Sequence, residues 1–202
     1  MKTTVIAIDG YASTGKSTLS KQLAKHLGYT YVDTGYMFRA IGFLVLQNNW
    51  LKNDIIAVTE LEKALPALQF SWKEGEDAQM HMALNDRVYG EELRTTEVSN
   101  LVSKVAALPA VRAHLLEQQR SLSKASSVVM DGRDIGTVVF PKATYKFFLN
   151  AAPKIRAERR YAEMQAKGIS GSLEEVLANV IERDRLDSTR AIAPLVKAED
   201  AI

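Results

Sequence analysis

The chain has 202 residues, of which 47% are hydrophobic, enough for one well-buried core with room for a small appended lobe or lid. Its 26 basic and 24 acidic residues give a formal net charge of +2, so bulk charge indicates neither nucleic acid nor an anionic membrane as partner. The absence of cysteine excludes a disulfide scaffold, thiolate zinc sites and thiol catalysis. Neither a signal peptide nor a spanning helix is indicated, and we expect a soluble, cytoplasmic monomer.

The first 50 residues predict a βαβ unit. A short apolar run with β-branched residues predicts a buried strand over 3–9, and a second strand is expected over 29–33. Between them, 16–27 is predicted to be a helix with Leu19, Leu23, Ala24 and Leu27 on one apolar face and Gly28 as its stop. A further helix is expected from about 37 to 46. Two strands joined through a helix imply a parallel sheet covered on both faces.

The middle of the chain has a different pattern. Short polar–apolar alternation over 68–89, broken at 74–77, predicts an antiparallel hairpin inserted into the α/β chain. Helical periodicity over 97–122 is interrupted at Pro109, which suits the first turn of a new helix. Strands at 127–130 and 145–149 resume the parallel sheet. Two arginine-rich helices follow, joined by a flexible segment at 167–172.

A phosphate-binding loop stands between the first strand and the first helix. The pattern G-x-x-x-x-G-K-[ST] is matched in a strand–loop–helix context, which predicts that backbone N–H groups and the helix N-terminus face phosphates. Lys16 would pair with the β- and γ-phosphates, and Ser17 would place its hydroxyl on Mg²⁺. The predicted donor site for ATP comprises Gly10, Tyr11, Ala12, Ser13, Thr14, Gly15, Lys16, Ser17 and Thr18.

The loop alone does not separate kinases from other nucleotide-binding proteins. A switch GTPase would carry an Asn-Lys-x-Asp segment after a later strand. The corresponding strand here continues into 149–153, Leu-Asn-Ala-Ala-Pro, which lacks that segment.

Three further motifs resemble the cytidylate kinase family. The segment 33–39, DTGYMFR, is similar to D-[ST]-G-A-x-Y-R, and 130–141, MDGRDIGTVVFP, is similar to D-G-R-D-x-G-T-x-[VI]-F-P. The segment 182–194, ERDRLDSTRAIAP, resembles E-R-D-x-x-D-x-x-R-x-x-x-P. The motifs occur in the family's order and, with the phosphate-binding loop, cover nearly the whole chain. Departures are Tyr36 and Phe38, where a small residue and Tyr are usual, and Tyr11-Ala12, where Gly-Pro-x is more common.

The resemblance implies a site for the phosphate acceptor. Arg39, Arg133 and Arg190 correspond to residues that hold the CMP phosphate, and arginine suits this role because its planar fork stays charged. Asp187 would accept from the ribose hydroxyls with Arg183 beside it, although an intrahelical Arg183–Asp187 ion pair explains the spacing equally. The implied substrate-binding residues are Thr34, Arg39, Ser103, Arg112, Arg133, Asp134, Arg183, Asp187 and Arg190, with Asp134 reading the base.

The remaining predictions concern the lid and the metal. Arg156, Arg159 and Arg160 share one helical face, so they either form a lid over ATP or lie on an ordinary solvated face with Glu158 and Glu163. Asp131 ends an apolar strand and either supports Mg²⁺ with Ser17 or simply caps the strand. The predicted catalytic residues are Lys16, Asp131, Arg133 and Arg190.

Together these predictions give an α/β, three-layer P-loop NTPase fold with a parallel sheet over residues 1–202. It would carry a small inserted antiparallel acceptor-binding lobe at about 68–94 and a helical lid at about 154–184, and the family's usual last strand and helix are expected to be missing. The expected reaction transfers the γ-phosphoryl of ATP, with Mg²⁺, to CMP or dCMP. Two alternatives stay open: a kinase for another small acceptor such as UMP or shikimate, and a non-catalytic nucleotide-binding regulator.

Overall fold

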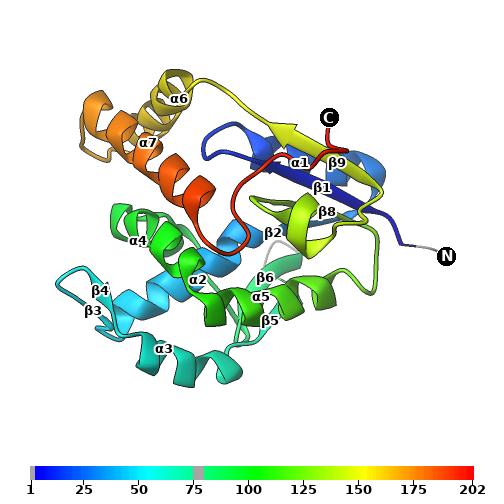
Figure 1. Ribbon diagram of the computed structural model, residues 1–202, viewed down its shortest axis with the longest axis horizontal. Coiled ribbons are helices and arrows are strands. Elements are labelled where there is room, and N and C mark those ends of the chain that lie inside the picture. Colours follow the sequence, from blue (N-terminus) through cyan, green and yellow to red (C-terminus); the bar gives the residue numbers. More distant parts are fainter. Residues whose placement is uncertain (1–2, 75–79) are drawn as a thin grey trace. The chain divides into compact units, whose positions relative to one another are not determined.

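The computed structural model describes residues 3–74 and 80–202 (Figure 1). It divides the chain into two compact units, of which the first comprises Met1–Tyr31 and Ser126–Ile202 and the second Val32–Ala125. The second unit therefore begins well before the insertion predicted at about 68–94.

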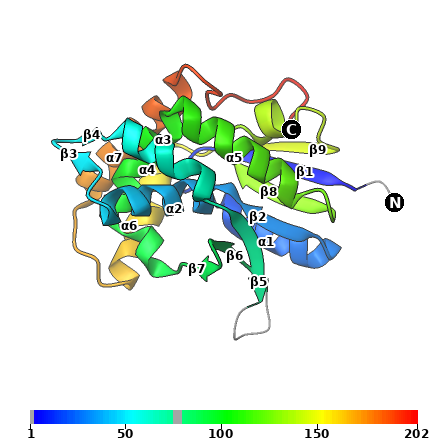
Figure 2. The ribbon, with the colours of Figure 1, turned by 90° about the horizontal axis from the view of Figure 1, so that it is seen from below.

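The first unit is built on a parallel sheet. Its strands are β1 (Val5–Gly10), β8 (Val128–Gly132) and β9 (Tyr145–Leu149), together with β2 (Thr30–Asp33), whose last two residues already belong to the second unit. The strand order is β2-β8-β1-β9. Strand β1 pairs in parallel with both β8 and β9, as the βαβ pattern predicts, and these strands lie side by side in Figure 2. The core of this sheet includes Ile6, Ile8 and Val129, all nearly inaccessible to solvent. The register aligns Asp9 with Gly132, so the phosphate-binding loop and the loop after β8 begin at the same edge of the sheet.

Helix α1 (Lys16–Leu27) has the predicted bounds and packs on β8, but its predicted apolar face is partly wrong. Ala24 is buried and Leu23 packs against the core, whereas Leu19 and Leu27 are 44% and 41% exposed. A helix turns through 360° in 3.6 residues, so these four positions are spread around the helix. A single contact with the sheet, one or two residues wide, cannot cover all of them. Gly28, with a φ of 66°, ends the helix as expected.

Helices α6 (Pro153–Ala166) and α7 (Leu173–Thr189) form the predicted pair after β9 and lie side by side (Figure 1). They share a small core of Ala157, Val176 and Val180, so the pair is packed by its own apolar residues. Ser172 begins α7 with a capping box that Glu175 completes, which satisfies N–H groups at the helix start.

The second unit is largely helical and carries two small antiparallel sheets. Helices α2 (Thr34–Gln47) and α4 (Thr96–Ala107) pack together, and α5 (Pro109–Leu122) follows α4 directly, with Pro109 in its first turn as predicted. The predicted hairpin is confirmed as β5 (Phe70–Glu74) paired with β6 (Met80–Leu84), to which β7 (Arg87–Val88) is added. The break predicted at 74–77 lies, apart from Glu74, outside the described residues. The remaining elements are β3 (Leu51–Lys52), β4 (Ile55–Ile56), α3 (Val58–Ala64) and the short turns η1 (Leu65–Ala67) and η2 (Glu91–Arg94).

Two tight turns in this unit were not predicted, although the sequence contains their signal. Asn53-Asp54 joins β3 to β4, and Asn85-Asp86 joins β6 to β7, with φ values of 48° and 64° and of 48° and 62°. Asn and Asp tolerate this left-handed backbone better than most residues, and two-residue hairpin turns require it. An Asn-Asp pair flanked by short apolar stretches is therefore a hairpin signal.

Candidate active site

The phosphate-binding loop is held closely against β9. Gly10 has a φ of 142°, and a Cβ atom at this position would lie 2.0 Å from the backbone oxygen of Leu149. Only glycine allows this approach, because any side chain would collide with backbone that cannot move away. Gly15, with a φ of 93°, turns the chain into α1, whose first residue is Lys16. The loop therefore reaches the N-terminus of α1, where anions are favoured.

Lys16 is more buried than a loop lysine is expected to be, because only 5% of it is exposed. Its ammonium group donates to the backbone oxygen of Tyr11 at 2.5 Å and to Thr14 Oγ1 at 3.3 Å. Burial and the nearby positive charge of Arg133 lower the pKa of Lys16 well below its usual value, while Asp131 and Asp9 oppose that shift. A buried cation next to another cation is costly unless an anion is bound beside it, which suits a polyphosphate site.

Ser17 and Asp131, the two predicted metal-binding residues, lie in contact. The Ser17 hydroxyl donates to Asp131 Oδ2 at 2.7 Å, and the Tyr31 hydroxyl donates to Oδ1 at 3.0 Å. Asp131 is 4% exposed and stands in β8, one residue before the strand ends. Within the described ranges no cluster of three or more acidic, histidine or cysteine side chains forms a complete metal cage. A single carboxylate and a hydroxyl still fit Mg²⁺, which keeps several waters and takes its other ligands from substrate phosphates.

The loop after β8 joins a cluster of opposite charges with the end of α7. Arg133 donates to Asp187 Oδ2 at 3.0 Å, and Arg190 lies 3.8 Å from Asp187 Oδ1 and 3.5 Å from Asp134 Oδ1. Burial alone would raise the pKa of Asp187, but Arg133, Arg183 and Arg190 hold it below its ordinary value. The structure therefore brings together all five predicted acceptor residues that belong to this unit: Arg133, Asp134, Arg183, Asp187 and Arg190.

Arg183 and Asp187 lie on α7, whereas Arg190 is the residue just after the helix ends. The spacing of i, i+4 and i+7 would place all three on one face only if the helix continued to Arg190, so a common helical face holds for the first two only. Arg190 is in extended backbone and donates from Nε to the backbone oxygen of Ala193 at 2.5 Å, which fixes its guanidinium beside Asp134.

The three predicted lid arginines have different surroundings. Arg156 is 1% exposed, its fork is bidentate to Asp184, and its Nε donates to the backbone oxygen of Ala151 at 2.8 Å. Arg159 is exposed and reaches the backbone oxygen of Thr14 at 3.4 Å, and Arg160 is half-buried. For Arg156 the solvated-face alternative is wrong, because this residue is buried where α6 packs on α7.

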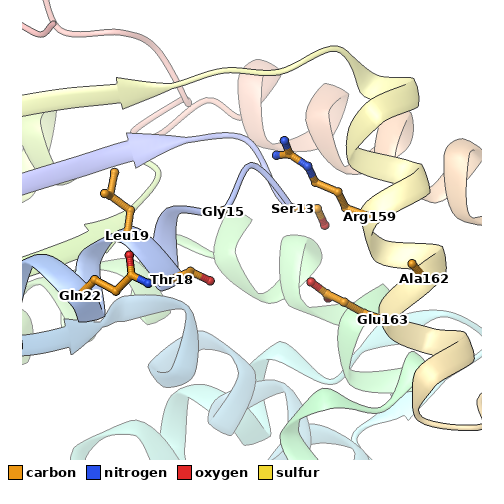
Figure 3. Close-up of a pocket in the computed structure, with 8 residues that line it drawn as sticks. All are labelled: Ser13, Gly15, Thr18, Leu19, Gln22, Arg159, Ala162 and Glu163. Carbon is orange, nitrogen blue, oxygen red and sulfur yellow. The ribbon is translucent and has the colours of Figure 1, made fainter.

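A cavity of about 550 Å³ opens between α6 and the start of α1. Figure 3 shows Arg159 extending from α6 toward the loop that carries Ser13, with the Glu163 carboxylate on the same side of α6. The volume of the cavity is typical of a small-molecule pocket, and the lining of the cavity combines loop backbone with one cation. The lining residues are Ser13, Gly15, Thr18, Leu19, Gln22, Arg159, Ala162 and Glu163.

In the second unit, Asp33 organises the start of α2. Its carboxylate caps the helix by accepting from the Tyr36 N–H at 3.0 Å and accepts from Arg39 at 2.8 Å. Burial would raise the pKa of Asp33, but Arg39 lowers it below the ordinary value. A Cβ atom on Gly35 would lie 2.8 Å from the Arg39 guanidinium, so glycine leaves the space that this arginine occupies. Thr34, another predicted acceptor residue, is the buried first residue of α2.

Ser103 and Arg112 are both buried, on α4 and α5, rather than on a plain helix surface. The Ser103 hydroxyl has no hydrogen-bond partner among the described residues. Arg112 donates to the backbone oxygen of Ala106 at 3.1 Å, and its guanidinium lies 5.6 Å from the centre of the Phe38 ring. A buried hydroxyl without a partner is uncommon and is consistent with a polar ligand.

A family model described as cytidylate kinase matches residues 6–202. The chain belongs to the cytidylate kinase family. It is 52% identical over its whole length to the cytidylate kinase of Flavobacterium psychrophilum and 50% identical to that of Flavobacterium johnsoniae, and it covers 90% and 88% of those proteins. The cytidylate kinase of Carboxydothermus hydrogenoformans is 49% identical over 98% of this chain and 87% of its own length.

Two departures from the cytidylate kinase motifs have clear local contacts. Tyr36 accepts a hydrogen bond from the Tyr89 N–H at 3.0 Å and packs edge-on against Phe70, so its ring is part of the second unit's own packing. Tyr11 packs edge-on against Phe148, and the Arg156 guanidinium lies 5.1 Å from its ring centre. Both larger side chains are therefore held by neighbours in their own unit.

Asp9 is a buried charged residue outside the motifs that predict the site. It is the next-to-last residue of β1, just before Gly10, and is 5% exposed. Both of its carboxylate oxygens accept backbone N–H groups, from Ile135 at 2.8 Å and from Gly136 at 2.7 Å. Burial raises the pKa of Asp9 from 3.8 to about 6, with a smaller push from Asp134, while the two N–H donors and Lys16 oppose the rise. The sequence does carry a signal for Asp9, a carboxylate at the end of a predicted buried strand, and Asp131 shows the same signal.

The raised pKa of Asp9 predicts a pH-dependent stability. A group whose pKa is higher in the folded state favours folding when it is protonated, and this contribution is lost as the pH rises through the folded value. Between pH 4 and 7 the unfolding free energy of wild type should therefore fall by about 2 kcal/mol relative to that of Asp9→Asn. Urea denaturation of both proteins at several pH values measures this difference. A constant difference across that range would contradict the raised pKa.

Proposed function

We propose that this chain transfers the γ-phosphoryl group of ATP to CMP or dCMP, giving ADP and CDP or dCDP. Family membership over residues 6–202 supports this activity, and neither a kinase for UMP or shikimate nor a non-catalytic regulator is favoured by it. Transfer would be direct and in line, with no covalent intermediate, because positioning and charge neutralisation are what phosphoryl transfer requires.

One observation within the first unit carries the proposal. The consecutive residues 131–134 join two sites: Asp131 contacts Ser17 of the phosphate-binding loop, while Arg133 and Asp134 belong to the charged cluster with Asp187 and Arg190. A donor phosphate at the loop and an acceptor phosphate at the arginines would then be neighbours. Two polyanions repel each other, and these cations offset that repulsion.

On the donor side, Lys16 would neutralise the β- and γ-phosphates, and Ser17 with Asp131 would hold Mg²⁺. Bound Mg²⁺ supplies further charge neutralisation on the transferring group. Arg159 and Arg160 are proposed to cover ATP from α6 and to exclude water that would otherwise hydrolyse it. For Arg156 the structure supports a different role, because Asp184 and backbone oxygens already occupy its guanidinium.

On the acceptor side, Arg39, Arg133 and Arg190 are proposed to bind the CMP phosphate, with Thr34 near it. Asp187 would accept from the ribose hydroxyls, supported by Arg183. Asp134, Ser103 and Arg112 are proposed for the base, with Arg112 donating to cytosine O2 and N3. Two observations support these roles: the buried Ser103 hydroxyl has no hydrogen-bond partner among the described residues, and the pKa of Asp187 is depressed.

The partners are proposed to be these small molecules only, and the protein is proposed to act as a cytoplasmic monomer. The near-neutral net charge gives no bulk reason to expect nucleic acid or an anionic membrane as partner, and the lack of cysteine fits a reducing compartment. Within the described residues no helix is long and apolar enough to cross a membrane.

A panel of acceptors tests the proposal. Purified protein is incubated with ATP and Mg²⁺ together with CMP, dCMP, UMP, shikimate or no acceptor, and ADP release is measured by a coupled assay. We expect ADP release with CMP and dCMP well above that with UMP and shikimate. Retained ATP binding without turnover on any acceptor would favour the regulator, and the highest rate on UMP or shikimate would favour a different kinase.

Arg39→Ala, Arg133→Ala and Arg190→Ala should each weaken CMP binding more than ATP binding. The loss should be roughly 2 to 5 kcal/mol per residue where the paired phosphate is largely desolvated. Calorimetric titration of each variant with CMP and separately with ATP measures both affinities. Arg120→Ala, on α5 and outside every proposed site, is the matched control. Equal losses for the two ligands would instead assign the arginines to the donor.

A further inference from the structure

Asp9 lies within the first unit where the phosphate-binding loop meets the loop after β8. We call the latter the acceptor loop, because it carries Arg133 and Asp134. The next residue, Gly10, is the first of the phosphate-binding loop and is packed against the Leu149 backbone with no room for a side chain. Asp9 therefore stands on backbone that has little freedom to move. A carboxylate on such a support is a fixed anchor for whatever it binds.

Asp9 holds the segment 132–136 at both of its ends. In the sheet, Asp9 is paired in register with Gly132, the last residue of β8. Beyond the loop, its two carboxylate oxygens accept the N–H groups of Ile135 and Gly136, the first two residues of the helical turn η3 (Ile135–Val139). Arg133 and Asp134 are the two residues that lie between these attachments.

Because both ends of the segment are attached, Arg133 and Asp134 can point in few directions. Arg133 then donates to Asp187, and Asp134 lies beside Arg190. Within η3, the N–H groups of Val138 and Val139 are bonded to the Asp134 backbone oxygen, so the turn itself is closed. Its first two N–H groups need an acceptor from outside the turn, as at every helix start, and Asp9 provides it.

We propose that Asp9 is a positioning residue of the transfer reaction, which fixes the Arg133–Asp134 loop against the phosphate-binding strand so that the acceptor site is formed before CMP binds. This inference rests on the proposed function for its substrate. Asp9 touches no substrate itself and acts through the two backbone N–H groups. The folded protein keeps this buried carboxylate although burial disfavours its ionised form, and such a cost is typical of residues retained for a site rather than for stability.

Asp9→Asn is the sharpest variant, because it preserves shape while changing one acceptor into a donor. Its amide oxygen can still accept one N–H group, but its NH₂ faces the other N–H group and cannot accept. The loop should then be attached at one point instead of two. Thr137→Val is the matched control in the same turn, since the Thr137 hydroxyl has no hydrogen-bond partner among the described residues.

The first measurement separates an effect on CMP, the phosphate acceptor, from an effect on ATP, the phosphate donor. In Asp9→Asn the KM for CMP should rise between about tenfold and 100-fold, as expected for a small displacement of a binding group, while the KM for ATP changes less than about twofold. Thr137→Val should behave as wild type. Asp9 also lies near Lys16, so a loss that follows ATP, or that falls equally on both substrates, would overturn the proposal and assign Asp9 to the phosphate-binding loop or to general stability.

The second measurement needs neither turnover nor a folded variant. Hydrogen–deuterium exchange of wild type without CMP should show protected amides at Ile135 and Gly136, and Asp9→Asn, if folded, should lose protection there and keep it in α1. Rapid exchange at both amides in wild type until CMP is added would mean that the acceptor loop is not formed in advance, and would overturn the proposal. If wild type phosphorylates no CMP but these amides are protected, the proposed substrate fails while the Asp9 attachment stands.

Discussion

Lys16→Ala is expected to lower kcat by at least about 100-fold, the scale at which enzymes lose rate when one group that stabilises transition-state charge is removed. In the structure the Lys16 ammonium lies inside the phosphate-binding loop, bonded to Tyr11 and Thr14, where it would meet the β- and γ-phosphates. Alanine removes the charge and leaves the loop backbone in place. The effect should therefore fall on the chemical step more than on folding.

The stability of Lys16→Ala provides the check on this interpretation. Lys16 is buried next to the positive charge of Arg133, so its removal relieves a repulsion as well as losing two hydrogen bonds. We expect the urea midpoint to stay near that of wild type. Lys25→Ala, an exposed lysine on the same helix, should leave both rate and stability unchanged. Turnover of Lys16→Ala within threefold of wild type would contradict the role of Lys16.

Asp134→Ala is expected to lower kcat/KM for CMP by roughly 2 to 4 kcal/mol while changing UMP turnover much less. Cytosine presents an N4 amino donor where uracil presents an oxygen acceptor, so an ionised carboxylate attracts the first base and repels the second. Asp134 is 5% exposed, so its charge is poorly screened by water. Removal of the Asp134 carboxylate should reduce the preference for CMP over UMP by lowering the rate with CMP.

Asp134 also lies 3.5 Å from Arg190. Holding Arg190 in place is therefore a second role, which must be separated from reading the base. Asp134→Asn keeps the shape and one acceptor oxygen but adds a donor that uracil can use. If Asp134 reads the base, the CMP to UMP ratio of kcat/KM should fall in both variants and fall further in Asp134→Asn. Equal losses for CMP and UMP would show that Asp134 serves mainly to hold Arg190.

The parallel sheet and the closeness of Ser17 to Asp131 could be predicted from the sequence because their signals are local. A glycine-rich turn between a strand and a helix, and a carboxylate at the end of β8, each define a backbone position, and the structure places Ser17 and Asp131 in contact. The residues after β8 and near the end of α7 form one cluster because their motifs supply opposite charges that pair when the elements pack.

The failures concern properties that depend on packing. A spacing of i, i+3 and i+4 placed Arg156, Arg159 and Arg160 on one face, but spacing does not say which edge of that face contacts α7, and Arg156 is buried on Asp184. The burial of Lys16 does not follow from its place at the end of a loop, because it depends on contacts with Tyr11 and Thr14. Asp9 was missed since its partners, Ile135 and Gly136, lie more than 120 residues away along the chain.

Transfer of a labelled phosphoryl group tests directly whether the γ-phosphoryl of ATP moves to a cytidine monophosphate. Wild-type protein is incubated with Mg²⁺, CMP and ATP labelled at the γ-phosphate, and the products are separated. We expect the label to appear in CDP in proportion to the ADP formed, and Lys16→Ala to give almost none. Label recovered as inorganic phosphate, or label that stays in ATP while CMP is present in excess, would contradict this expectation.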